Sequence, residues 1–256
     1  MNRGEKENLL NGARILERVS ASITNFKPSK YGYVMVGVMD DEDTQTQAVI
    51  LEHPGELCVF FPCTREIADA KRDADADMHA TWIGPTGSKA HDGCRQAVEA
   101  WAPTLSWGII KSKQWKDPNT VLSIWGYSLG GGLAVLAAMA MKSYHAARSI
   151  NCYTFGALKV CDKKLAGYFS DNIIQSVQCV YLEDIVTHVP MWAVRVRGDL
   201  HLNEDGFVYP GIVKGFWNNV CRIAGNVLSW CRLKARFEAH DIHKYIAAIE
   251  AELRKP

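Results

Sequence analysis

The chain has 256 residues, of which 48% are hydrophobic and 22% charged, and this ordinary globular composition excludes a disordered tail, a fibre and a coiled coil. Its 29 basic and 28 acidic residues give a net charge of +1, which argues against a dedicated nucleic-acid binder, because such proteins are strongly basic. No internal repeat or low-complexity linker interrupts the sequence, so we expect a single domain over residues 1–256.

The first segment, residues 1–30, is predicted to form an N-terminal helical extension. Its charges are interleaved with leucine and isoleucine at helical spacing, and it lacks the apolar core of a secretory signal. The longest run of small apolar residues, 133–141, is well short of the roughly 20 residues that span a membrane, so it is expected to be a buried helix.

The eight cysteines form no C-x-x-C pair, which argues against a zinc ribbon and against a thioredoxin-type redox motif. They are too sparse for a disulfide scaffold, and several lie inside apolar runs. We therefore expect reduced, buried thiols and a cytoplasmic protein.

The rest of the chain alternates apolar segments with amphipathic ones. Strands are predicted over residues 33–39, 46–53, 56–61, 120–125, 151–155 and 176–182. Helices are predicted over residues 65–78, 93–107, 133–146, 163–170, 211–237 and 240–253. Residues 192–196 and 200–202 are expected to form a hairpin-like excursion. This order predicts an α/β fold with a mostly parallel central sheet and helices on both faces.

The motif that carries chemistry is G-x-S-x-G at residues 126–130, between an apolar strand and an alanine-rich helix. A sharp strand-to-helix turn forces Ser128 into a strained conformation that exposes its hydroxyl, and the flanking glycines make room for the turn. A phosphate-binding loop is the alternative, and it is disfavoured because no Gly-Lys-Ser/Thr follows. We therefore predict Ser128 as a nucleophile and the N–H of Leu129, the next residue, as an oxyanion donor.

The G-x-S-x-G turn and the segments around it resemble the class 3 lipases, which are serine acyl hydrolases with an α/β-hydrolase fold. The similar segments occur in the family's order and are VFFPCTRE from Val59, KAHDGCRQAVEAW from Lys89, VLSIWGYSLGGGLAVLAAMAM from Val121, CYTFGALKVCDKKLAGYF from Cys152, VYLEDIVTHVP from Val180 and AHDIHKYIAAI from Ala239. The resemblance spans about residues 45–253.

This resemblance implies a catalytic triad of Ser128, Asp184 and His240, and the order Ser, Asp, His is the one that an α/β-hydrolase fold requires. It also implies that Thr64 supplies a second oxyanion donor beside Leu129. The implied activity is hydrolysis of carboxylic esters of acylglycerols, phospholipids or smaller molecules through an acyl-enzyme intermediate. No cofactor or metal is implied for this chemistry.

The base has competitors at His188, His201 and His243, and the family motif favours His240. The remaining histidines are expected to have structural or surface roles; these are His53, His79, His91 and His145.

The sequence departs from the family where Pro62-Cys63 replaces the Arg-Gly that precedes the oxyanion threonine. This departure keeps open a non-enzymatic lipid-binding module with a degenerate oxyanion hole. A thioesterase or peptidase on the same triad is the other alternative, because the triad serves several acyl groups.

One local charge asymmetry is hidden in the net charge. Residues 206–237 contain no acidic residue and five basic ones, among apolar and aromatic residues at helical spacing. This pattern is typical either of a helix packed on the sheet with a solvated basic side or of a lid or interfacial helix. The second interpretation predicts peripheral contact with anionic membranes.

Overall fold

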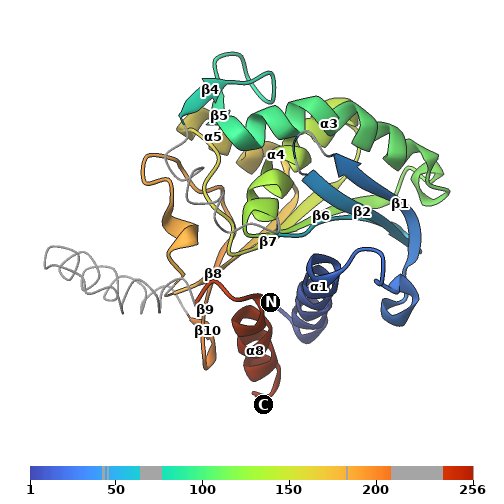
Figure 1. The fold of residues 1–256 in the computed structure, drawn as a ribbon, viewed down its shortest axis with the longest axis vertical. Helices are drawn as coiled ribbons and strands as arrows, with labels where there is room; N and C mark the ends of the chain where they lie inside the picture. Colours follow the sequence, from blue (N-terminus) through green and yellow to red (C-terminus); the bar gives the residue numbers. More distant parts are fainter. Residues whose placement is uncertain (42–43, 45, 64–76, 183, 209–238, 256) are drawn as a thin grey trace, which may run out of the picture.

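The computed structural model describes residues 1–41, 44, 46–63, 77–182, 184–208 and 239–255. Its centre is a sheet with the strand order β1-β2-β3-β6-β7-β8-β9-β10 (Figure 1). The strands are β1 Val34–Asp41, β2 Thr46–His53, β3 Glu56–Phe61, β6 Val121–Tyr127, β7 Ile150–Phe155, β8 Gln175–Tyr181, β9 Asp199–Asn203 and β10 Gly206–Val208. A second, two-stranded sheet consists of β4 Met78–Ala80 and β5 Lys89–His91.

The middle of the sheet is parallel, from β3 through β6, β7 and β8 to β9. The strands at the two edges are antiparallel, namely β1 and β2 on one side and β10 on the other. Parallel strands end at the same edge of a sheet, so the loops that leave β3, β6, β7 and β8 gather there. This edge carries Ser128 and Asp184, two of the residues that the sequence predicts to be catalytic.

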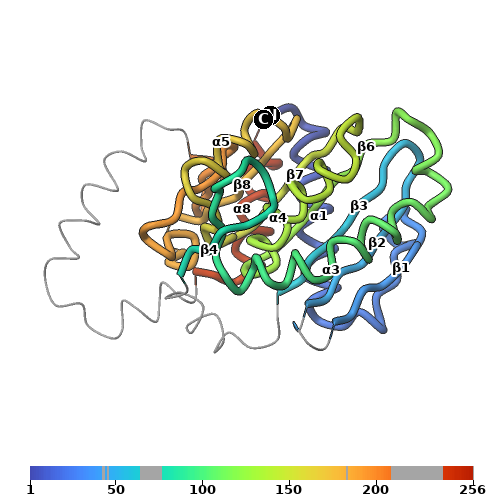
Figure 2. The backbone as a smooth tube through the Cα atoms, turned by 90° about the horizontal axis from the view of Figure 1, so that it is seen from above, coloured from blue at the N-terminus to red at the C-terminus, as the bar shows by residue number. Residues whose placement is uncertain are grey.

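Helices cover both faces of the sheet, as Figures 1 and 2 show. The helices are α1 Arg3–Ala21, α3 Asp92–Lys111, α4 Leu129–Tyr144, α5 Lys163–Asn172 and α8 Ile242–Leu253, with 3-10 turns η1 Pro28–Tyr31, η2 Gln114–Lys116 and η3 Val186–His188. One hydrophobic cluster joins α3, α4 and α5 to the sheet, and a second joins α1 and α8 to its other face. The predicted α/β fold, mostly parallel with helices on both faces, is confirmed.

Helix α1 starts with a capping box, in which the Asn2 side chain accepts the N–H of Glu5 and the Glu5 side chain accepts that of Asn2. The helix ends at Ala21, so it occupies only part of the predicted 1–30 segment. Its apolar face is buried against the sheet. Because it packs into a core cluster, α1 can influence the strands beneath it.

Two segments differ from the sequence prediction. Residues 192–196 and 200–202 do not pair as a hairpin, because β9 pairs with β8 instead and Val194 bridges to Cys161. A hairpin does form further along the chain, where a tight turn joins β9 to the antiparallel strand β10. The prediction failed because sequence alternation identifies a strand but not its partner.

The basic segment predicted over residues 206–237 begins with strand β10, and so its first residues are not helical. Its remainder, from 209 onward, lies outside the described residues. Most of the helix predicted over 65–78 also lies outside them, and at its end Met78 begins β4.

No disulfide links the cysteines in the described part of the chain, which are Cys58, Cys63, Cys94, Cys152, Cys161 and Cys179. Within the same residues, no helix combines the length and the apolar character needed to cross a bilayer.

Candidate active site

Ser128 lies between the end of β6 and the start of α4, and its backbone has φ 60° and ψ −125°. A non-glycine residue in such a conformation costs on the order of 1–3 kcal/mol, so its surroundings must hold it in place. A Cβ atom at Gly126 would lie 2.2 Å from the carbonyl oxygen of Gly130, and one at Gly130 would lie 2.4 Å from the carbonyl oxygens of Phe61 and Pro62. Only glycines permit this turn, and it presents the hydroxyl of Ser128 at the edge of the sheet.

Asp184 follows β8 at the same edge, and its side chain is fully buried. Its Oδ1 atom accepts the N–H of Val186 at 2.9 Å, and its carbonyl oxygen accepts the hydroxyl of Thr187 at 2.8 Å. These bonds fix the turn that follows the strand, and they leave Oδ2 directed at His240.

His240 lies directly before Asp241, the N-cap of α8, rather than inside the helix. Its Nδ1 atom is 2.7 Å from Asp184 Oδ2, and its Nε2 atom is 2.6 Å from Ser128 Oγ. The three side chains are nearly inaccessible, with 4%, 0% and 6% exposure for Ser128, Asp184 and His240. The structure thus brings together three residues from three separate segments in the arrangement that transfers a proton from a serine.

The competing histidines interact elsewhere. The Nε2 atom of His188 lies 3.3 Å from the hydroxyl of Thr187, and the Nε2 atom of His201 lies 3.9 Å from Asp199 Oδ2. His243 is exposed on α8 and contacts both Asp241 and Glu17. The position next to Ser128 is therefore occupied by His240.

Two tyrosines that the sequence analysis did not single out support this arrangement. Tyr127 stacks on the imidazole of His240, and its hydroxyl donates to the main-chain carbonyl of His240. The hydroxyl of Tyr245 donates to Asp184 Oδ2 at 2.5 Å and accepts the N–H of Tyr181 at 3.2 Å. Burial raises the pKa of both phenols, and the charge of Asp184 raises it further, so both remain donors at neutral pH.

Gly156, which follows β7, provides room for His240 and Asp184. Its φ of +59° is in the left-handed region, and a Cβ atom there would lie 2.9 Å from His240 Cε1 and 3.0 Å from Asp184 Oδ2. Its sequence signal is its place in the family-like segment YTFG. A larger residue would displace the histidine or the carboxylate.

Leu129 is the first residue of α4, and the first N–H groups of a helix have no partner within it. The positive end of the helix dipole favours negative charge at the same place. Thr64, the other predicted oxyanion residue, lies outside the described residues. The chain before it is described, and the N–H of Cys63 donates to the hydroxyl of Ser20 at 3.3 Å.

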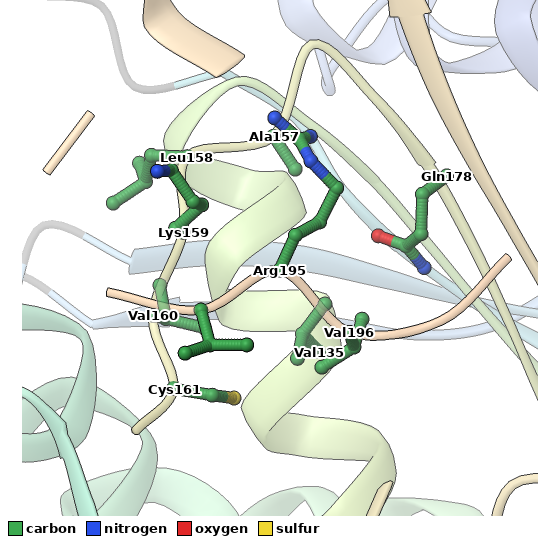
Figure 3. A pocket seen from close by; sticks show the side chains of 10 residues that line it. Val135, Ala157, Leu158, Lys159, Val160, Cys161, Gln178, Arg195 and Val196 are labelled. Carbon is green, nitrogen blue, oxygen red and sulfur yellow. The ribbon is translucent and has the colours of Figure 1, made fainter. Parts of the chain in front are cut away.

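A small pocket lies beside α4, between the segment that follows β7 and the one that leads to β9 (Figure 3). Its volume of about 10 Å³ holds about one water molecule, which is far too little for an ester substrate. In the described part of the chain, no group of histidine, cysteine and acidic residues could hold a metal ion.

Similar folds occur among solved fungal lipases. The native lipase–propeptide complex of Rhizomucor miehei matches with a TM-score of 0.66 at 19% identity, over 78% of this chain and 68% of that one. The triacylglycerol lipase of Penicillium expansum matches with a TM-score of 0.67 at 18% identity, over 79% of this chain and 81% of that one. The lipase of Rhizopus microsporus var. chinensis matches with a TM-score of 0.64 at 22% identity, over 79% of this chain and 75% of that one.

At these identities the solved structures establish the α/β-hydrolase fold. A search of curated proteins finds no match. The sequence model of the family described as "Lipase (class 3)" matches residues 58–194, more than half of the chain, and this range includes both Ser128 and Asp184. The chain therefore belongs to the class 3 lipase family.

Proposed function

We propose that the protein is a serine ester hydrolase that cleaves carboxylic ester bonds of lipids, either acylglycerols or phospholipids, or of smaller esters. The observation that carries the proposal is the unbroken hydrogen-bond chain from Ser128 Oγ through His240 to Asp184, with distances of 2.6 and 2.7 Å. The site lies in a family of lipases, and this favours an ester over another acyl compound.

In the first half of the reaction, Ser128 Oγ attacks the ester carbonyl while His240 Nε2 accepts its proton. Asp184 holds the tautomer of the imidazole and stabilises the imidazolium. The tetrahedral intermediate then collapses, the ester C–O bond breaks, and His240 returns the proton to the departing alcohol. In the second half a water molecule attacks the acyl-enzyme, again with His240 as the base, and the carboxylic acid leaves.

The negative charge of the tetrahedral intermediate needs donors that are already in place. The N–H of Leu129 at the start of α4 is one, and Thr64 is proposed as the second. Loss of one such donor typically raises the barrier by about 2.7–4 kcal/mol.

The direct test measures turnover of short- and medium-chain p-nitrophenyl esters by the wild type and by Ser128→Ala. We expect the variant to lose about four orders of magnitude or more in kcat. Ser106→Ala is the matched control, because Ser106 is also buried and also contacts a histidine, with its Oγ 3.0 Å from His145 Nε2. Equal activity of wild type and Ser128→Ala would remove Ser128 from the mechanism.

A panel of ester, thioester and amide substrates decides among acyl hydrolases, and a screen of lipid classes identifies the head group. Faster turnover of thioesters or amides than of esters would favour a thioesterase or a peptidase. Stable lipid binding without labelling of Ser128 by a fluorophosphonate would favour a non-catalytic module.

The cysteine pattern also leads us to propose a cytoplasmic location. The basic composition of residues 206–237 leads us to propose, in addition, peripheral contact with anionic membranes. The membrane contact is tested by vesicle sedimentation. Binding to anionic vesicles should weaken as salt rises, and equal binding to neutral and anionic vesicles at low salt would contradict it.

A further inference from the structure

The last turns of helix α1 contact two segments that border the candidate active site. We infer that Ser20, on the last turn of α1, is a positioning residue for ester hydrolysis, because its hydroxyl holds the backbone of Cys63 beside Ser128. The inference rests on the proposed function. Helix α1 lies outside residues 58–194, the range that the family model matches, so the family assignment gives it no role.

The position of α1 is fixed by close packing against β6, the strand that leads to Ser128. A Cβ atom at Gly12 would lie 2.1 Å from the ring of Trp125, so the helix backbone rests directly on that indole. Three ionic contacts also join α1 to α8; they are Lys6 with Glu252 at 2.8 Å, Arg14 with Glu250 at 2.6 Å and Glu17 with His243 at 3.0 Å. A helix held in this way can position a residue that bonds to it.

The segment that Ser20 contacts, residues 61–63, lies between helices α1 and α4. The end of β3 lies against the first turn of α4, where a Cβ atom at Gly130 would lie 2.4 Å from the carbonyl oxygens of Phe61 and Pro62. The next residue, Cys63, donates its N–H to Ser20 Oγ at 3.3 Å. The first turn of α4 thus limits the approach of this chain on one side, and Ser20 anchors it on the other.

The same face of α1 reaches the segment of the base. Glu17 precedes Ser20 by three residues, and residues three apart lie on one face of a helix. Its carboxylate lies 3.0 Å from Nε2 of His243, in the first turn of α8, three residues after His240. One face of α1 therefore connects the chain beside the nucleophile with the chain that carries the base.

Removing the hydroxyl of Ser20 leaves the N–H of Cys63 without this acceptor and frees the backbone to move relative to Ser128. Small displacements at a reacting centre affect the chemical step much more than the binding of a substrate. We therefore expect Ser20→Ala to lower kcat about tenfold and to leave KM nearly unchanged. Ser20→Thr retains a hydroxyl and should restore most of the activity.

Ser22→Ala is the matched control, since Ser22 caps the same helix and its hydroxyl contacts only local residues, Thr24 and Asn25. The measurements are kcat and KM on p-nitrophenyl esters, the rate of fluorophosphonate labelling of Ser128, and the melting temperature. If Ser20→Ala does not fold, Ser20→Cys carries the test, because it preserves the size of the side chain but offers only a weak acceptor.

The expected result is a lower kcat and slower labelling in Ser20→Ala, together with recovery in Ser20→Thr and wild-type values in Ser22→Ala. A lower melting temperature with unchanged kcat would mean a purely structural role and would overturn the inference. An active wild type with equal kcat in Ser20→Ala would overturn it while leaving the proposed function intact. A wild type that neither turns over esters nor is labelled would overturn both.

Discussion

The ring of Tyr127 stacks on the imidazole of His240, with ring centres 5.2 Å apart and planes 21° apart. The same tyrosine donates its hydroxyl to the main-chain carbonyl of His240. Tyr127 directly precedes Ser128, so the strand that presents the proposed nucleophile also holds the proposed base. Ser128 and His240, the two residues of the proposed proton transfer, are thus linked through Tyr127 as well as by their own hydrogen bond.

Tyr127→Phe preserves the stacked ring and removes only the hydroxyl. The buried carbonyl of His240 then loses a donor, which costs about 1–3 kcal/mol of folding free energy. We expect urea unfolding to show this loss of folding free energy. We also expect a lower kcat with little change in KM, because His240 is less firmly held. Tyr153→Phe is the control, since Tyr153 bonds to Gln175. Equal kcat in wild type and Tyr127→Phe would contradict the prediction.

Tyr245→Phe tests the support of the proposed acid. The fully buried hydroxyl of Tyr245 donates to Asp184 Oδ2 and accepts the N–H of Tyr181, so its removal leaves two buried groups short of a partner. We expect a loss of about 1–3 kcal/mol in folding free energy, measured by urea unfolding, and a reduced kcat. Retention of full activity despite lower stability would show that His240 and the N–H of Val186 keep the carboxylate in place without Tyr245.

Gly156→Ala should abolish most of the activity, since the new Cβ atom would lie 2.9 Å from His240 Cε1 and 3.0 Å from Asp184 Oδ2. Gly55→Ala is matched in backbone conformation, with φ +78° against +59°, and its Cβ atom would meet nothing within 4 Å. Both variants pay about 1–2 kcal/mol for a left-handed alanine. Turnover and melting temperature separate the two effects, and an equal fall in kcat in both variants would refute a local clash.

The fold could be predicted where a local pattern determines the structure. The strands over 46–53 and 56–61 have the bounds expected from their alternation and from the Pro-Gly turn between them. The strained turn at Ser128 follows from its glycines, which are close neighbours in the sequence. Such features depend on a few adjacent residues, and the sequence therefore contains them.

Contacts between distant segments could not be predicted in this way. The bond from Cys63 to Ser20 joins residues 43 apart, and the contact of Tyr245 with Asp184 joins residues 61 apart. Each depends on how helices pack on the sheet, which hydrophobic periodicity does not specify. The pairing of β9 failed for the same reason, since alternation identifies a strand and leaves its neighbour open. The family motif does carry long-range information, and it led us to predict His240 as the base rather than His188, His201 or His243.

A pH-dependent contribution to stability is expected from Glu252, which is buried near the end of α8. It accepts hydrogen bonds from Lys255 at 2.7 Å, from Lys6 at 2.8 Å and from the N–H of Phe207 at 3.2 Å. Burial raises its pKa, but the bonds from Lys255, Lys6 and Phe207 outweigh burial and lower the pKa from 4.5 to about 2. The carboxylate therefore ties α1, α8 and β10 together as long as it is ionised.

Because the folded pKa is depressed, this stabilisation is fully present above pH 4.5 and is lost as the pH falls towards about 2. Glu252→Gln should unfold at lower urea concentration than the wild type at about pH 6, and the difference should shrink at about pH 3. Glu250→Gln is the control on the same helix, because its ion pair with Arg14 is partly exposed and worth little. A constant difference between wild type and Glu252→Gln across this range would mean that ionisation of Glu252 does not stabilise the fold, and that its contacts act only through packing.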